Sequence, residues 1–148
     1  MSGSGASIRL TVAQAIVRFL MNQFIEINGA EVRVCGGGFG IFGHGNVPCL
    51  GQALYPVRDD LPLYRGQNEQ SMGFAAAAYA KYHLRRRFIF CTASAGPGTA
   101  NLLTAAALAH ANRLLVLMLC GDKLNDAFRK VSRHWDRVTH PPKILHAL

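Results

Sequence analysis

The fold is decided around Tyr64-Arg65-Gly66-Gln67-Asn68-Glu69-Gln70, which separates a predicted buried strand from an alanine-rich segment. The strand is expected over residues 61–65 and a helix over residues 69–84, because helix formers such as alanine fill the second segment. A carboxylate at a strand-to-helix junction of an α/β chain lies where such folds bind ligands. Glu69 is therefore the first candidate functional residue, and the alternative is an acid that merely favours the helix dipole.

A second loop of this kind follows a strand predicted over residues 88–92. It reads Thr92-Ala93-Ser94-Ala95-Gly96-Pro97-Gly98-Thr99-Ala100-Asn101 and leads into a helix expected over residues 99–112. Glycines let a ligand approach the backbone, and free N–H groups at a helix start can bind polar atoms. The alternative is a tight turn with proline at the helix start. Together the two loops indicate half of a cofactor-binding site.

The rest of the chain continues the alternation of strands and helices. Thr11 is expected to cap a helix that runs to about Ile27 and ends at Asn28-Gly29. The order predicts an α/β three-layer sandwich with a mostly parallel central sheet. Residues 126–138 fit either a strand or a helix, and a last helix is expected to begin near residue 139. The other expected elements are a strand over 31–35, a glycine-rich loop over 36–45, a short helix over 47–54 and a buried strand over 114–120.

Composition narrows the class of protein. Of the 148 residues, 50% are hydrophobic and 16% are charged, which is typical of a globular chain. We expect a flexible segment over residues 1–7 and a single domain over residues 8–148. No uninterrupted apolar run reaches membrane-spanning length. The four cysteines are widely spaced, and Cys91 and Cys120 fall in predicted buried strands, which favours reduced thiols in a cytoplasmic protein.

The net charge of +8 is concentrated in two basic clusters, at residues 85–87 and 129–137. Nucleic-acid binding is one interpretation. A solvated helix end, or a face that meets an acidic partner, is the other. We favour the second because no aromatic residues alternate with these charges and no helix-turn-helix pattern accompanies them.

Three other motifs are incomplete. Residues 38–43 match G-x-G-x-x-G, but residues 44–48 postpone the helix that a dinucleotide phosphate site needs. Ser94 has Thr92 rather than glycine two residues before it, so a serine-hydrolase elbow is absent. The six histidines lack metal-ligand spacing, so we predict no metal site within the chain. Among them only His44 falls near the expected ligand edge.

The order of motifs resembles the pyrimidine-binding domain of the acetohydroxyacid synthase-like thiamine diphosphate enzymes. The resemblance covers most of residues 8–122 and continues more loosely over 125–148. It rests on residues 65–70, 75–80, 92–101 and 114–122, and residues 9–15 and 39–47 resemble those of the ring-opening hydrolases of inositol catabolism.

The resemblance implies thiamine diphosphate as cofactor and Glu69 as the catalytic residue. In that family the matching glutamate binds N1′ of the aminopyrimidine, which favours the imino tautomer that accepts the thiazolium C2 proton; the cofactor then performs the chemistry. His44 could bind a substrate oxygen. The cofactor-binding residues implied in this way are Glu69, Gly43, His44, Ser94, Gly96, Pro97, Gly98 and Asn101.

Two departures from the family limit what the chain can do alone. The family holds the diphosphate and Mg²⁺ on a separate domain through a G-D-G motif, whereas this chain has Gly121-Asp122-Lys123. The segment between Asp122 and Asn125 is also shorter than in the family.

We therefore expect the pyrimidine-binding half of a C–C bond-cleaving, ring-opening hydrolase that acts on a cyclic diketone. It would need a diphosphate-binding domain, with its Mg²⁺, from another chain, and would form a homo- or hetero-oligomer. A helix face carrying Gly73, Ala76, Ala77 and Ala80 is expected to form the subunit interface. The alternative is a non-catalytic truncated or engineered fragment, with a basic nucleic-acid-binding domain as third choice.

Overall fold

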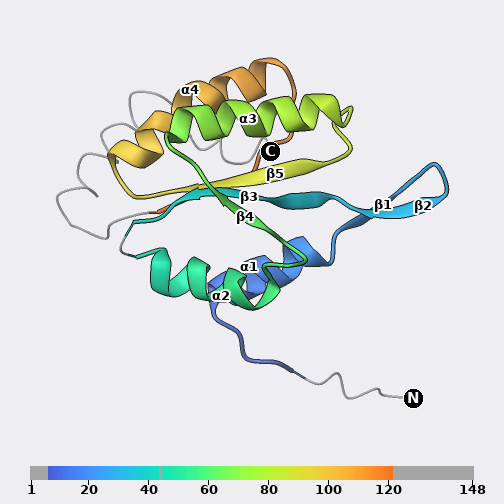
Figure 1. The fold of residues 1–148 in the computed structure, drawn as a ribbon, viewed down its shortest axis with the longest axis horizontal. Coiled ribbons are helices and arrows are strands. Elements are labelled where there is room, and N and C mark those ends of the chain that lie inside the picture. The colour runs from blue at the N-terminus through green and yellow to red at the C-terminus, as the bar shows by residue number, and fades with distance from the viewer. Residues whose placement is uncertain (1–6, 44, 122–148) are drawn as a thin grey trace.

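A parallel four-stranded sheet forms the centre of the computed structural model, which describes residues 7–43 and 45–121 (Figure 1). The strand order is β4 (Leu63–Arg65), β3 (Cys35–Ile41), β5 (Phe88–Ala93) and β6 (Met118–Cys120), and all three pairings are parallel. This confirms the predicted α/β sandwich with a parallel sheet.

Helices cover both faces of the sheet (Figure 1). One face carries α3 (Glu69–Tyr82) and α4 (Pro97–Ala111). The other carries α1 (Val12–Met21), the π-helical turn η1 (Val47–Gly51), α2 (Gln52–Leu54) and the 3-10 turn η2 (Tyr55–Val57). β5 is buried along its whole length, as expected for a continuous apolar strand between two helical layers.

Each face has its own hydrophobic core. Met72, Ala76, Leu102 and Val116 belong to the core under α3 and α4. Leu20, Leu54, Leu61 and Phe90 belong to the core above α1 and α2. The small face of α3 therefore packs inside the chain, and Ala76, Ala77 and Ala80 are each at most 1% exposed. A Cβ added at Gly73 would overlap Ala105 of α4, so the expectation that this face forms a subunit interface is wrong.

The first helix is shorter than the sequence suggested. Thr11 caps it as predicted, in a capping box with Gln14, but the helix ends at Met21 rather than near Ile27. Phe24–Ile27 forms β1, which pairs antiparallel with β2 (Ala30–Arg33). Asn28 and Gly29 have φ values of 53° and 78°, as a two-residue hairpin turn requires. Asn28-Gly29 therefore turns a hairpin and does not end a helix.

The predicted glycine-rich loop is also corrected, since Gly36–Gly40 lies within the central strand β3. The glycines make room for neighbouring side chains. A Cβ at Gly38 would overlap the ring of Phe90, and a Cβ at Gly36 would overlap the Tyr79 hydroxyl. The connection after β3 therefore begins only at Phe42, which also removes the G-x-G-x-x-G motif as a phosphate loop.

Other boundaries shift by a few residues. β4 begins at Leu63 instead of residue 61, α3 ends at Tyr82 instead of 84, and α4 begins at Pro97 instead of 99. The short helix over 47–54 is confirmed as η1 and α2, whereas only Met118–Cys120 of the expected strand over 114–120 pairs as β6. The elements expected after residue 122 lie outside the described residues. No described helix is long and apolar enough to cross a membrane.

The first basic cluster serves the fold itself. The guanidinium of Arg85 donates to the carbonyls of Arg113 and Asn112, at 3.1 and 3.3 Å. Arg87 Nε donates to the carbonyl of Arg33 at 3.0 Å. Two of the three arginines thus bind backbone at the ends of elements, which favours the structural interpretation of this cluster. The second cluster lies outside the described residues.

Alkaline pH is expected to destabilise the fold through Cys91. Burial raises the pKa of its thiol from 9.0 to about 12. The Cys91 thiol therefore ionises at a lower pH in the unfolded chain than in the folded chain. Its contribution to the free energy of unfolding is complete below about pH 9 and is lost as the pH rises toward 12. Denaturant unfolding at about pH 8 and about pH 10 should differ by on the order of 1 kcal/mol. Cys91→Ala should flatten this slope, whereas Cys49→Ala, at an exposed thiol, should leave it unchanged.

Candidate functional site

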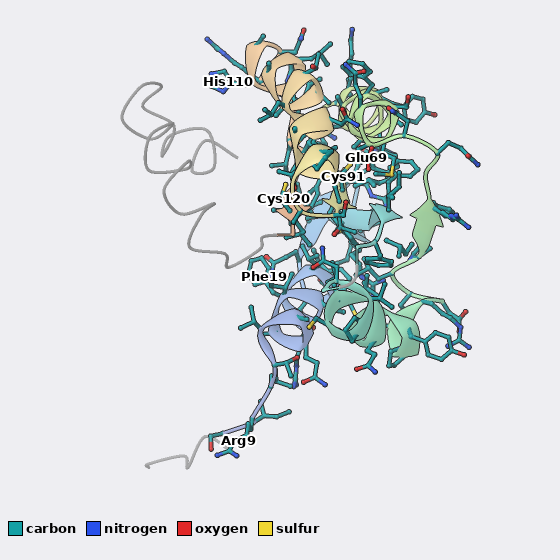
Figure 2. All side chains as sticks on the ribbon, turned by 90° about the vertical axis from the view of Figure 1, so that its left-hand side faces the viewer. Arg9, Phe19, Glu69, Cys91, His110 and Cys120 are labelled. Atoms are coloured by element: carbon teal, nitrogen blue, oxygen red, sulfur yellow. The ribbon has the colours of Figure 1, made fainter. Side chains whose placement is uncertain are left out.

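The carboxyl ends of the parallel strands meet at one edge of the sheet. The loop after β3 begins at Phe42, the loop after β4 leads to Glu69, and the loop after β5 begins at Ser94. Figure 2 shows Glu69 near the start of α4. Such an edge is where open α/β sheets bind ligands.

Glu69 is the first residue of α3 and is half-buried. Asn68 caps this helix, since its Oδ1 accepts from the Ser71 N–H at 3.0 Å. Asn101 Nδ2 donates to Glu69 Oε2 at 3.2 Å, which joins the starts of α3 and α4. Among the described residues, the Glu69 carboxylate accepts this hydrogen bond alone. Its other oxygen, Oε1, can therefore accept from a further donor.

Gly98 allows Glu69 and Ser94 to approach the first turn of α4. A Cβ at Gly98 would lie 3.0 Å from Glu69 Oε1 and 2.6 Å from Ser94 Oγ. Gly43 plays a similar part, because a Cβ there would lie 2.6 Å from Ser94 Cβ. The structure thus brings together five of the sequence-predicted site residues: Glu69, Gly43, Ser94, Gly98 and Asn101.

The loop between Ser94 and α4 is held in one conformation. Gly96 is the N-cap of α4 with φ 74° and ψ −120°, a backbone conformation that glycine adopts readily. Pro97 follows at the first helical position and is exposed. The backbone N–H and the hydroxyl of Thr99 both donate to the carbonyl of Ser94, at 3.0 and 2.9 Å. His44 lies outside the described residues.

Asn46 was not among the predicted site residues. Its Nδ2 donates to the Ala93 carbonyl at 3.3 Å and to Thr92 Oγ1 at 3.4 Å. The Gly121 N–H donates to the same carbonyl at 2.9 Å. Asn46 therefore ties the connection after β3 to the end of β5. The sequence feature that could have suggested Asn46 is its position beyond a strand end, two residues after His44.

A cavity of about 570 Å³ opens beside Asn46, between α1, η1 and the end of β6. Its walls are mainly apolar and include Val12, Ile16, Leu50 and Leu119. Cys120 also lines this cavity and is exposed, so the expectation of a buried Cys120 is wrong; Cys91 is buried as predicted. In the part of the chain that the structure describes, no group of three His, Cys, Asp or Glu side chains could hold a metal ion.

Comparison with known proteins identifies the family. The family model described as "Thiamine pyrophosphate enzyme, N-terminal TPP binding domain" matches residues 30–138. The chain is 44% identical, over 97% of its length, to a 3D-(3,5/4)-trihydroxycyclohexane-1,2-dione hydrolase of Geobacillus thermodenitrificans. It is 43% identical to hydrolase 2 of that name from Bacillus cereus and 42% identical to the enzyme of Bacillus thuringiensis, in both cases over 96% of its length.

The chain spans about a quarter of the length of these relatives, 26% in each case. The alignment with the Geobacillus enzyme extends over 165 residues, which exceeds the 148 residues of this chain. The relative therefore carries residues that this chain lacks within the aligned region. The matched family model covers most of the sequence, and the chain thus belongs to the family of N-terminal TPP-binding domains of thiamine pyrophosphate enzymes.

Proposed function

We propose that this chain is the pyrimidine-binding half of a thiamine diphosphate-dependent, ring-opening hydrolase of inositol catabolism that cleaves a C–C bond in a cyclic diketone. The names of the relatives and the family support this proposal. The observation that carries it is the Glu69 carboxylate, which Asn101 holds at the carboxyl edge of the sheet by one oxygen.

The described residues fit an aminopyrimidine. Glu69 presents Oε1 beside Gly98, where the absence of a Cβ lets a flat ring approach the start of α4. We propose that this oxygen binds and shares the proton of the ring nitrogen N1′, while Asn101 fixes the orientation of the carboxylate. Thiamine diphosphate, when bound, stabilises the carbanion that C–C cleavage requires.

The neighbouring residues would shape the walls of this site. Gly43 and Ser94 pack against each other, and Gly96 and Pro97 lead into α4. We propose that they line the pyrimidine, and that His44 binds a substrate oxygen.

We propose that the diphosphate and Mg²⁺ are held by a domain of another chain, so that the active unit is an oligomer. We also propose that residues 8–148 form a single domain after a short N-terminal segment, and that it functions in the cytoplasm. The free thiols of Cys35 and Cys91 in the core fit a reducing compartment.

Complementation tests the proposed function. The chain would be mixed with a diphosphate-binding partner, Mg²⁺ and thiamine diphosphate, and ring opening of the diketone would be followed. A chimaera in which this chain replaces the matching first quarter of the Geobacillus hydrolase distinguishes failed assembly from failed chemistry. An active mixture or chimaera supports the proposal, whereas a folded, assembled and inactive chimaera contradicts it.

The second candidate is a non-catalytic fragment. It is favoured by the residues that the chain lacks relative to the Geobacillus enzyme. Calorimetry separates the two candidates, because a fragment of this kind should give neither heat nor a thermal shift with thiamine diphosphate and the partner domain.

Asn101 is expected to matter for activity more than for stability. Asn101→Ala removes the donor to Glu69 Oε2, and a hydrogen bond to a charged group at this exposed position should be worth about tenfold in the complemented rate. Asn112→Ala is the matched control, since that side chain donates to the Leu108 carbonyl at the other end of α4. Equal rates in the two variants would remove the positioning role of Asn101.

A further inference from the structure

Asn46 lies in the connection that follows β3, at the same edge of the sheet as Glu69. It is the N-cap residue of η1, where an asparagine side chain usually accepts a hydrogen bond from an N–H of the first helical turn. Here the side chain makes no such capping bond. Helix capping therefore does not account for the carboxamide, whose hydrogen bonds go to a different element.

The carboxamide of Asn46 binds the end of β5. Its Nδ2 donates to the Ala93 carbonyl at 3.3 Å and to Thr92 Oγ1 at 3.4 Å, which uses both of its hydrogens. Thr92 is fully buried, so its hydroxyl is a fixed partner. Gly121 leaves room for the carboxamide, because a Cβ there would lie 3.2 Å from Asn46 Nδ2. Asn46 is thus held at the ends of two neighbouring strands, β5 and β6.

The backbone of Asn46 fixes the loop that precedes it. Its N–H donates to the Gly43 carbonyl at 3.1 Å, and the Val47 N–H donates to the same carbonyl at 3.3 Å. Its own carbonyl accepts from the Gly51 N–H at 2.9 Å, with the five-residue spacing of a π-helical turn. Such turns are rare and occur frequently at functional sites. A movement of the Asn46 side chain away from β5 would therefore carry Gly43 with it.

Gly43 is linked to the Glu69 carboxylate by direct packing. A Cβ at Gly43 would lie 2.6 Å from Ser94 Cβ, so these two residues are in contact. Ser94 in turn lies against Gly98, where a Cβ would be 2.6 Å from Ser94 Oγ and 3.0 Å from Glu69 Oε1. These three residues form a continuous wall, the Gly43 wall, between Asn46 and Glu69. Because packed interiors transmit small displacements, a shift of the β3 connection should reach Oε1.

We propose that Asn46 is a positioning residue of the cofactor site: its carboxamide holds the Gly43 wall at the distance from Glu69 that the aminopyrimidine ring requires. This inference rests on the proposed function, which places the ring against that wall. An aspartate at this position would have the same shape, but its ionised carboxylate could not donate to the Ala93 carbonyl. Loss of the two donors should therefore loosen the wall without removing any of its atoms.

Nuclear magnetic resonance of the full chain, without cofactor, tests the first half of the proposal. Asn46→Ala should shift the amide signal of Gly98 and the side-chain carboxyl signal of Glu69. Asn22→Ala is the matched control, because that side chain also donates to a backbone carbonyl, that of Arg18 at 2.7 Å, at the end of α1. It should leave both signals in place. Signals that do not move in Asn46→Ala would overturn the positioning role, whatever the cofactor does.

Calorimetry with thiamine diphosphate tests the second half, in the chimaera that carries this chain. The cofactor Kd should rise about tenfold in Asn46→Ala, as the loss of two neutral hydrogen bonds allows, and at least as much in Asn46→Asp. Asn22→Ala should bind the cofactor like the unchanged chimaera. A merely structural asparagine would give a different result, because Asn46→Ala would then lower the thermal unfolding temperature and leave the cofactor Kd unchanged.

The outcomes distinguish a wrong role for Asn46 from a wrong function for the chain. A folded, unchanged chimaera that binds no thiamine diphosphate overturns the proposed function, and the cofactor role of Asn46 with it. A chimaera that binds the cofactor equally well in its unchanged form and as Asn46→Ala overturns the positioning role alone. Weaker binding in both Asn46 variants but not in Asn22→Ala, together with the shifted signals, supports it.

Discussion

Replacing Glu69 with glutamine is expected to lower the rate of the complemented enzyme by a factor of about 10² to 10⁴, the usual contribution of a positioned proton-transferring side chain. Glutamine keeps the length of the side chain and can still accept from Asn101 Nδ2, so the starts of α3 and α4 should stay joined. It cannot share a proton with a ring nitrogen as a carboxylate does. The change therefore separates proton sharing from packing.

Three measurements make this result decisive. The rate of ring opening should fall, the thermal unfolding temperature should change little, and calorimetry should still detect the cofactor in the assembled enzyme. Glu26→Gln is the matched control, because Glu26 is an exposed acid in the β1–β2 hairpin at the opposite edge of the sheet. Equal activity of Glu69→Gln and the unchanged chain would end the proposed role of this carboxylate.

The layered fold could be predicted from the sequence because its signals are local and agree with one another. The residues of β5 are continuously apolar, and α3 is filled with helix formers behind a capping asparagine. The hairpin was missed although Asn28-Gly29 is a strong two-residue hairpin signal. The same dipeptide also ends helices, and the apolar spacing of α1 continued plausibly into residues 24–27. Only the pairing of β1 with β2 resolves that ambiguity.

The candidate site could also be predicted only in part from the sequence. The two loops that carry Glu69 and Ser94 were predicted because each lies between a strand and a helix. Their contacts could not be predicted, since the Asn101–Glu69 hydrogen bond and the approach of Gly43 to Ser94 depend on strand order and helix packing. Asn46 was missed for the same reason, because its partners in β5 lie 46 and 47 residues further along the chain.

Gly38→Val is expected to destabilise the fold by about 3 kcal/mol, the upper part of the range for overpacking a core. Strand propensity alone predicts the opposite, because valine favours strands and glycine weakens them. We expect destabilisation instead, because a Cβ at Gly38 of β3 would overlap the ring of Phe90 in the adjacent strand. Phe90 is fully buried between β3 and the core above α1, so its ring has no space into which to move.

Two further sets of variants test whether the Phe90 ring is the cause. Gly45→Ala should be nearly neutral, because a Cβ there meets no atom within 4 Å. Gly38→Ala combined with Phe90→Leu should be more stable than the sum of the two single changes predicts, since the smaller side chain in β5 vacates the space that the new Cβ needs. Denaturant unfolding of the unchanged chain, Gly38→Ala, Phe90→Leu and the double variant gives this coupling energy directly. Strict additivity would mean that the Phe90 ring is not what excludes a side chain at Gly38.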